Sequence, residues 1–115
     1  MWTRSGLIVV GVLLLAVNAQ AEDWQELTSS VGTRMLYDAD SARYDAQNDT
    51  VKVRARVPGM RPRWDAYSCS RYVSWLWNPI DQRWVSETIL DPSRPDNIVK
   101  LREMLCGKKR SLPAW

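Results

Sequence analysis

The sequence predicts an α+β domain: an antiparallel β-sheet of about six strands with a C-terminal α-helix packed on one face and tethered by a disulfide. Three observations predict it. Residues 51–57 alternate apolar and basic side chains, which is typical of a strand with one buried and one solvated face. Residues 98–105 carry apolar side chains at helical spacing. The two cysteines, Cys69 and Cys106, lie in a predicted strand and at the end of that helix.

The chain opens with a stretch that is typical of a secretory signal. Arg4 precedes an apolar run over residues 7–17, and Ala19-Gln20-Ala21 has the small residues of a cleavage site. The run is shorter than the roughly 20 residues of a membrane span. We therefore expect residues 1–21 to be a signal peptide and the mature protein to be exported and soluble; an uncleaved membrane anchor is the competing interpretation.

The first half of the mature chain divides into short strands separated by turn residues. Asp38-Ala39-Asp40-Ser41 favours a turn in which Asp and Ser side chains bond the backbone. Asp38 and Asp40 also offer two oxygen ligands for calcium or two carboxylates for acid–base chemistry, although the glycine and distal glutamate of an EF-hand are missing. The strands expected here are 23–28, 34–37, 43–45 and 51–57, with turns at 29–32 and 47–49.

A tryptophan-rich hairpin is expected at the middle of the sheet. One strand over 64–77 and another over 82–90 are joined by Asn78-Pro79-Ile80-Asp81, a typical turn sequence. Unless a bulge shifts the register, alternation places Tyr67, Cys69, Arg71, Val73, Trp75 and Trp77 on one face, with Trp84 opposite the tryptophans across the turn.

The final helix is expected to begin between Ser93 and Asp96, both good N-caps, and to end near Cys106 with Gly107 as the stop. Its apolar stripe should cover the sheet. Ile98, Leu101 and Leu105 form the stripe, and Lys100, Arg102 and Glu103 are expected in solvent.

Two cysteines in an exported chain predict a disulfide between Cys69 and Cys106. Closing that loop stabilises a small domain by on the order of 4 kcal/mol on the chain-entropy model. A catalytic cysteine pair is the alternative, but the spacing is not that of a redox motif.

The domain spans residues 22–107 in this interpretation, and residues 108–115 form a basic, flexible tail. The formal charge of +3 loses one unit with Arg4, and Lys108-Lys109-Arg110 supply more than the excess that remains. The nearly neutral body argues against nucleic acid as a partner. The absence of histidine excludes His-based triads and imidazole metal sites. We expect neither enzymatic activity nor a cofactor.

Two groups of side chains are candidate binding surfaces. A basic stripe that attracts an acidic glycan or an acidic protein is formed by Lys52, Arg54, Arg56, Arg61 and Arg63. An aromatic platform for a sugar or a peptide is formed by Trp64, Trp75, Trp77 and Trp84. The competing interpretations are a solvated strand face for the stripe, and burial of two of the four tryptophans in the core.

The order of several short motifs resembles the surface-adhesin protein E-like domain family. The motifs are Trp24, Tyr37 to Ser41, Val51 to Val53, Tyr67 to Cys69, and Pro92-Ser93 before a helix ending in Leu105-Cys106; the family often has a glycine between that proline and serine. The resemblance implies an antiparallel sheet with a disulfide-tethered C-terminal helix, in a protein at the periplasm or surface of a bacterium. The family's named member is dimeric and binds host extracellular-matrix and plasma proteins.

We therefore expect an exported bacterial interaction module that binds a host matrix protein or an envelope glycan without catalysis. A structural or accessory periplasmic protein with no dedicated ligand site is the alternative, and it predicts largely buried aromatic residues. A homodimer is also expected if the strand 51–57 lies at a sheet edge and pairs with its twin, although its like charges oppose that pairing.

Overall fold

The computed structural model describes residues 22–27, 34–94 and 96–115. The expected signal peptide (1–21) and the expected turn at 29–32 lie outside the described residues. Across the described ranges, no helix is long and apolar enough to cross a membrane.

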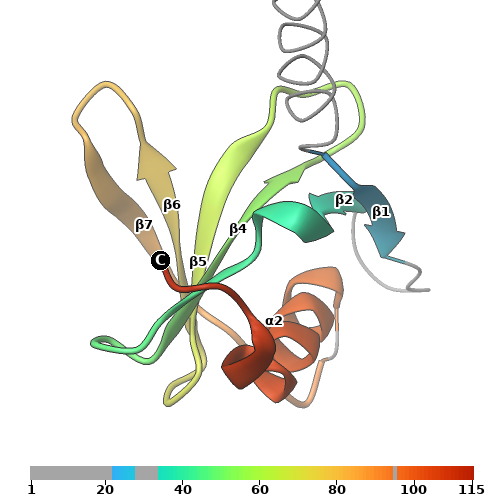
Figure 1. Cartoon of the computed structure of the whole chain (residues 1–115). Helices are drawn as coiled ribbons and strands as arrows, with labels where there is room; N and C mark the ends of the chain where they lie inside the picture. The colour runs from blue at the N-terminus through green and yellow to red at the C-terminus, as the bar shows by residue number, and fades with distance from the viewer. Residues whose placement is uncertain (1–21, 28–33, 95) are drawn as a thin grey trace, which may run out of the picture.

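One antiparallel sheet of seven strands and one long helix make up the described chain (Figure 1). The strand order is β1-β2-β4-β5-β6-β7, and β3 pairs with β4 beside β2. The predicted α+β class is confirmed. The elements are β1 (Trp24–Leu27), β2 (Met35–Asp38), the 3-10 helix η1 (Ala39–Ser41), β3 (Arg43–Asp45), β4 (Thr50–Arg56), β5 (Arg63–Ser68), β6 (Val73–Asn78), β7 (Arg83–Ile89), α2 (Asn97–Gly107) and the 3-10 helix η2 (Lys109–Ser111).

The sheet has seven strands rather than about six because the expected strand over 64–77 is two strands. A turn at 69–72 separates β5 from β6, and the Ser68 hydroxyl accepts the Arg71 N–H at 3.0 Å within it. The turn changes which side chains share a face. Tyr67 pairs with Val51, whereas Trp75 pairs with Ala66 on the opposite face, so the expectation that Tyr67 and Trp75 lie together is wrong.

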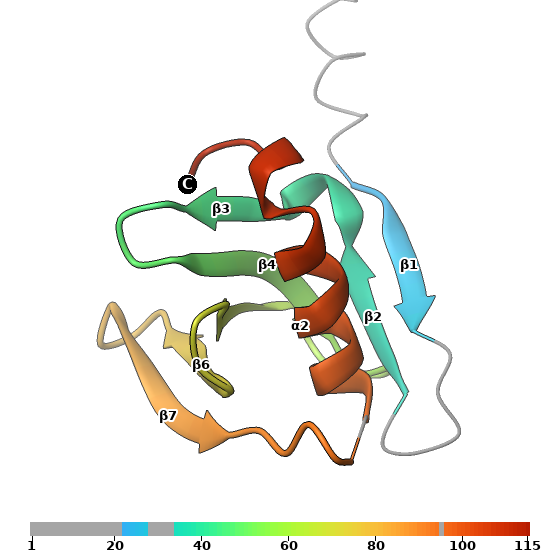
Figure 2. The same ribbon diagram turned by 90° about the horizontal axis from the view of Figure 1, so that it is seen from below.

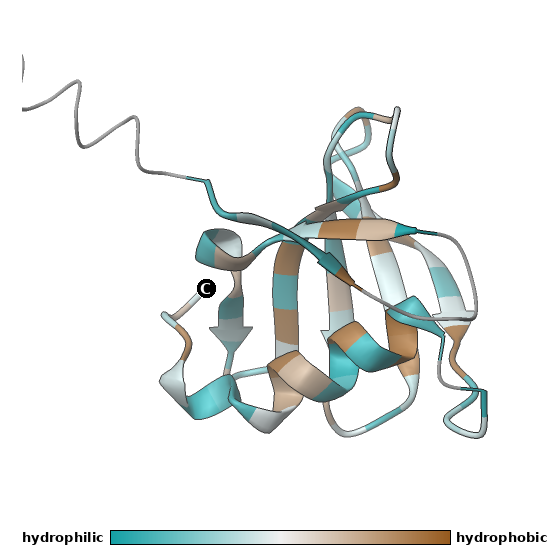
Figure 3. Cartoon of the chain, turned by 90° about the vertical axis from the view of Figure 1, so that its right-hand side faces the viewer, coloured by the Kyte–Doolittle hydropathy of each residue, from teal (hydrophilic) through white to brown (hydrophobic). Residues whose placement is uncertain are grey.

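Helix α2 covers one face of the sheet and forms the core with it (Figure 2). Val51, Val53 and Ala55 on β4 are fully buried, as their alternation predicts, and so are Leu101 and Leu105 of α2. Apolar and polar residues alternate along the strands that face the helix (Figure 3). Helix α2 is capped at its N-terminus as expected, since the side chain of Asp96 accepts the Val99 N–H at 3.0 Å.

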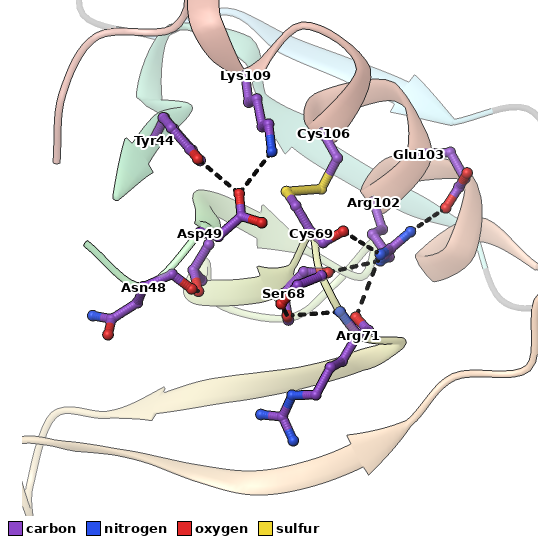
Figure 4. The surroundings of a disulfide bond; sticks show 12 residues. Tyr44, Asn48, Asp49, Ser68, Cys69, Arg71, Arg102, Glu103, Cys106 and Lys109 are labelled. Atoms are coloured by element: carbon purple, nitrogen blue, oxygen red, sulfur yellow. Dashed lines mark hydrogen bonds and ion pairs between the residues drawn. A yellow bond between two sulfur atoms is a disulfide. The ribbon is translucent and has the colours of Figure 1, made fainter. Parts of the chain in front are cut away.

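Two links hold α2 to the turn between β5 and β6 (Figure 4). The first is the expected Cys69–Cys106 disulfide, with the Cα atoms 5.6 Å apart. The second is Arg102, which was expected in solvent but is only 5% exposed. Its guanidinium donates to the carbonyl oxygens of Ser68 at 2.8 Å, Cys69 at 3.1 Å and Arg71 at 3.4 Å. The guanidinium thus supplies donors to carbonyls at the end of β5 and in the turn that follows it.

Residues 108–115 were expected to be a flexible tail, and the structure instead packs them along β3. The Tyr44 N–H donates to the Pro113 carbonyl at 2.9 Å, and the Trp115 N–H donates to the Tyr44 carbonyl at 3.0 Å. Lys109 Nζ also donates to the Asp49 carboxylate at 2.7 Å, and the Tyr44 hydroxyl donates to the same carboxylate at 2.7 Å. The C-terminal segment therefore covers an edge that β3 would otherwise leave unpaired.

Strand β4 lies inside the sheet, not at an edge. It pairs with β2 and β3 on one side and with β5 on the other. The expected route to a homodimer, in which residues 51–57 pair with their twin, is therefore closed.

Acidification is expected to loosen the C-terminal segment. The Lys109 ammonium, and then the Tyr44 hydroxyl, hold the pKa of Asp49 below its ordinary value of 3.8. Because the folded-state pKa is lowered, this stabilising contribution is complete above the ordinary value and is lost as pH falls through the lowered pKa. The backbone amide NMR signals of Tyr44 and Trp115 should move in that acidic window.

A matched pair of variants separates Asp49 from other carboxylates. In Asp49→Asn the two amide signals should already be shifted at neutral pH and should not titrate. Asp91 has a lowered pKa as well, but it bonds Ser93 before the N-terminal end of α2, so Asp91→Asn should titrate like the unmodified protein. Persistence of the acid shift in Asp49→Asn would contradict this assignment.

Candidate functional site

The sheet face turned away from α2 carries a row of tryptophans, which we call the tryptophan face. The register places Trp75 beside Ala66 on this face, and Trp77 opposite Trp84 as the sequence predicts. The tryptophans and basic residues of this face are Trp24, Trp64, Trp75, Trp77, Trp84 and Trp115 together with Lys52, Arg54 and Arg56.

The aromatic rings of this face contact one another in a chain. Trp77 and Trp84 meet edge to face with ring centroids 5.3 Å apart, as do Trp64 and Trp115 at 5.3 Å, and Trp84 and Trp115 lie 6.4 Å apart. The expectation that two of the four platform tryptophans belong to the core is wrong. Trp64, Trp75, Trp77 and Trp84 are all half-buried, because helix α2 covers the other face.

Lys52 lies beneath these rings and is not a solvated cation. It is 7% exposed, its Nζ is 3.2 Å from the Asp45 carboxylate, and the same atom lies 4.3 Å from the Trp115 ring centroid and 5.4 Å from that of Trp84. The ammonium is thus neutralised by Asp45 and covered by two rings.

Of the other residues in the expected basic stripe, Arg54 and Arg56 stay together, whereas Arg61 and Arg63 lie elsewhere. Arg54 contacts Glu22 at 3.6 Å, and both Arg54 and Arg56 lie over the Trp24 ring, at 5.8 and 4.7 Å. Arg61 is exposed in the loop between β4 and β5. Arg63 pairs with Ala55 on the face that α2 covers, and it bonds Asp65 at 3.0 Å, so it does not join the stripe.

A cleft of about 400 Å³ opens on the tryptophan face, at the end of the sheet where the β3–β4 and β5–β6 turns lie. This volume is within the range of small-molecule sites, about 300–1,000 Å³. Two indole rings and several polar groups surround it. The lining residues are Asp45, Asn48, Thr50, Lys52, Ala66, Ser68, Ser70, Arg71, Trp75 and Trp84.

The rim of the cleft is held from the opposite face of the sheet. Ser70 and Arg71 belong to the turn that Arg102 and the disulfide fix. The Cys69 N–H donates to the Asp49 carbonyl at 2.9 Å, which joins this turn to the β3–β4 turn that carries Asn48. Helix α2 therefore holds the backbone of residues that line the cleft on the opposite face.

Asp45 is an ionised acceptor in the cleft. The amide of Asn48, at 2.9 Å, is the largest cause of a lowered pKa for Asp45, and Lys52 adds to it. The carboxylate therefore carries its charge throughout the neutral range and balances that of Lys52.

A second carboxyl with a perturbed pKa lies on the face that α2 covers. Burial raises the pKa of Asp65, and Arg63 opposes that rise. Asp65 accepts the hydroxyl of Tyr67 at 2.9 Å, and burial raises the pKa of Tyr67 well above its usual value. The pair is enclosed in the core, so we assign it to packing.

Sequence reasoning identified Lys52, Trp75 and Trp84 but missed most polar groups of the cleft. Asn48 carried a signal as a hairpin-turn residue, although not for binding. Arg71 was placed on a long strand, and its role depends on the turn that breaks that strand. Trp115 belonged to the expected tail.

In comparisons with protein families, curated proteins and solved structures, no family model, no curated protein and no solved structure matches the chain.

Proposed function

We propose that the protein is a non-catalytic module, exported by a bacterium, that binds a glycan in the cleft of its tryptophan face. The cleft carries this proposal. Trp75 and Trp84 offer flat apolar rings, and carboxylate, amide and hydroxyl groups lie around them. A sugar ring has apolar C–H surfaces and a rim of hydroxyls, so stacking and hydrogen bonding suit it together.

The carboxylate content of the cleft supports binding rather than hydrolysis. Most glycosidases use two carboxylates, and the general acid among them has a raised pKa. Asp45 is the single carboxylate among the cleft-lining residues, its pKa is lowered, and Lys52 is bonded to it. The carboxylate of Asp45 already accepts from Gln47, Asn48 and Lys52, so it holds the neighbouring polar groups in place.

Two features support export and a bacterial envelope. A disulfide is typical of proteins in oxidising compartments. The motifs that resemble the surface-adhesin protein E-like domain family point to the same location. The accessory role without a ligand site predicts buried aromatics, and the half-buried tryptophans favour a binding role instead.

The test is binding of purified protein to an immobilised panel of neutral and acidic oligosaccharides. Trp75→Ala and Trp84→Ala should each weaken glycan binding by roughly 10- to 100-fold, because truncating a central aromatic contact costs about 2 kcal/mol. Trp24→Ala is the matched control. Trp24 is half-buried on the same face, but it belongs to β1, its ring contacts Arg56, and it lies outside the cleft.

Equal losses in all three variants would assign the effect to the sheet rather than to the cleft. Binding of a matrix protein, without any glycan on the panel, would replace the proposed ligand by a protein partner. Binding of neither would favour the accessory role.

A further inference from the structure

The cleft has an excess positive charge. Asp45, Lys52 and Arg71 are its charged lining residues, and the first two neutralise each other at 3.2 Å. Among the residues that the structure describes, Arg71 forms no ion pair and its side chain is exposed. One guanidinium is therefore available to a ligand.

The backbone that carries this guanidinium is fixed. The Arg71 N–H donates to the Ser68 hydroxyl at 3.0 Å, its carbonyl accepts from Arg102 at 3.4 Å, and Cys69 two residues earlier is in the disulfide. Figure 4 shows the Arg71 side chain pointing away from the disulfide and α2, toward β6 and β7. Because the turn is already ordered, a ligand does not have to order it.

The groups around Arg71 restrict the kind of anion. Trp75 and Trp84 suit a ring, and the exposed Asn48 and Ser70 suit hydroxyls, which a bare inorganic anion does not have. A guanidinium binds carboxylate, sulfate and phosphate through two parallel hydrogen bonds.

We propose that the cleft selects a sugar residue with an anionic substituent, stacked on Trp75 and Trp84 with its anionic group on Arg71. This selectivity rests on the proposed glycan binding and adds the charge class of the ligand. Arg71 is the specificity-determining residue, whereas Lys52 is retained by Asp45.

The experiment uses pairs of oligosaccharides that differ only in charge. Oligomers of galacturonic, glucuronic and mannuronic acid are compared by calorimetry with their methyl esters, and a sulfated hexose oligomer forms a third arm. The acidic member of a pair should bind roughly 10- to 150-fold more tightly, because a charge-assisted hydrogen bond contributes about 1.5–3 kcal/mol. A preference for the sulfated arm would identify a sulfate ester as the anionic group.

The variants assign the preference to one side chain. Arg71→Gln should bind the acid and the ester equally, at the affinity of the ester for the unmodified protein. Arg61→Gln is the matched control, because Arg61 is also exposed but lies in the β4–β5 loop at the opposite end of the sheet. It should keep the preference, and thermal unfolding should show that both variants are folded.

Each outcome decides between the two proposals. Equal binding of acid and ester by the unmodified protein overturns the selectivity and leaves glycan binding intact. A preference that survives in Arg71→Gln overturns the role of Arg71. Failure to bind any member of the panel overturns both.

Discussion

Replacing both cysteines by alanine is expected to lower the free energy of unfolding by about 4 kcal/mol, since the bond closes a loop with a sequence separation of 37. Such a loss is a large part of the 5–15 kcal/mol typical of a domain's total stability. The bond joins the end of α2 to the β5–β6 turn, so the loss should also weaken ligand binding by disordering Arg71. Urea unfolding followed by circular dichroism measures the first effect.

Reduction supplies the control for this double variant. A thiol reductant should bring the unmodified protein to the stability of the double-alanine variant and should leave that variant unchanged. A difference below about 1 kcal/mol between the oxidised protein and the variant would contradict the role of the disulfide as a principal link.

Arg102→Ala is expected to destabilise the fold by about 3 kcal/mol, although it replaces a charged residue on a helix. The change leaves the carbonyls of Ser68, Cys69 and Arg71 without this donor. It also removes the guanidinium that lies 3.9 Å from the ring centroid of Tyr72. Chemical denaturation gives the loss of stability, and the affinity of the cleft for its ligand should fall with it.

Lys100→Ala is the matched control for Arg102→Ala. Lys100 is an exposed cation on the same helix, so its replacement should change stability by no more than about 0.5 kcal/mol. Arg102→Lys keeps the charge but not the planar donor group, and it should fall between the two. Equal losses of stability in Arg102→Ala and Lys100→Ala would contradict the conclusion that Arg102 stabilises the β5–β6 turn.

Local patterns in the sequence predicted most of the fold. Alternation over residues 51–57 identified β4 and its buried face, and turn residues separated the neighbouring strands. Two candidate caps, Ser93 and Asp96, bracketed the start of α2, and Asp96 is the cap in the structure. Each of these patterns lies within a few residues of the element that it predicts. A single sequence is therefore enough to predict such elements.

The errors arose where distant parts of the chain meet. Arg102 has the usual features of a solvent-facing residue, and its burial is favourable because it donates to the carbonyls of Ser68, Cys69 and Arg71, far away in sequence. The C-terminal segment pairs with Tyr44, far away in sequence. The turn at 69–72 interrupts the alternation, and a break in a strand can move every later side chain to the other face. Ser70 and Arg71 of the cleft depend on the first and the third of these features.

NMR titration shows whether a glycan occupies the cleft of the tryptophan face. An acidic oligosaccharide is added to the nitrogen-labelled protein while the indole N–H signals and the Arg71 guanidinium signal are followed. We expect the signals of Trp75, Trp84 and Arg71 to shift together with one dissociation constant, and that of Trp24 to stay in place. Shifts confined to Trp24, to the β7 edge or to α2, or no shift at saturating ligand, would contradict glycan binding in the cleft.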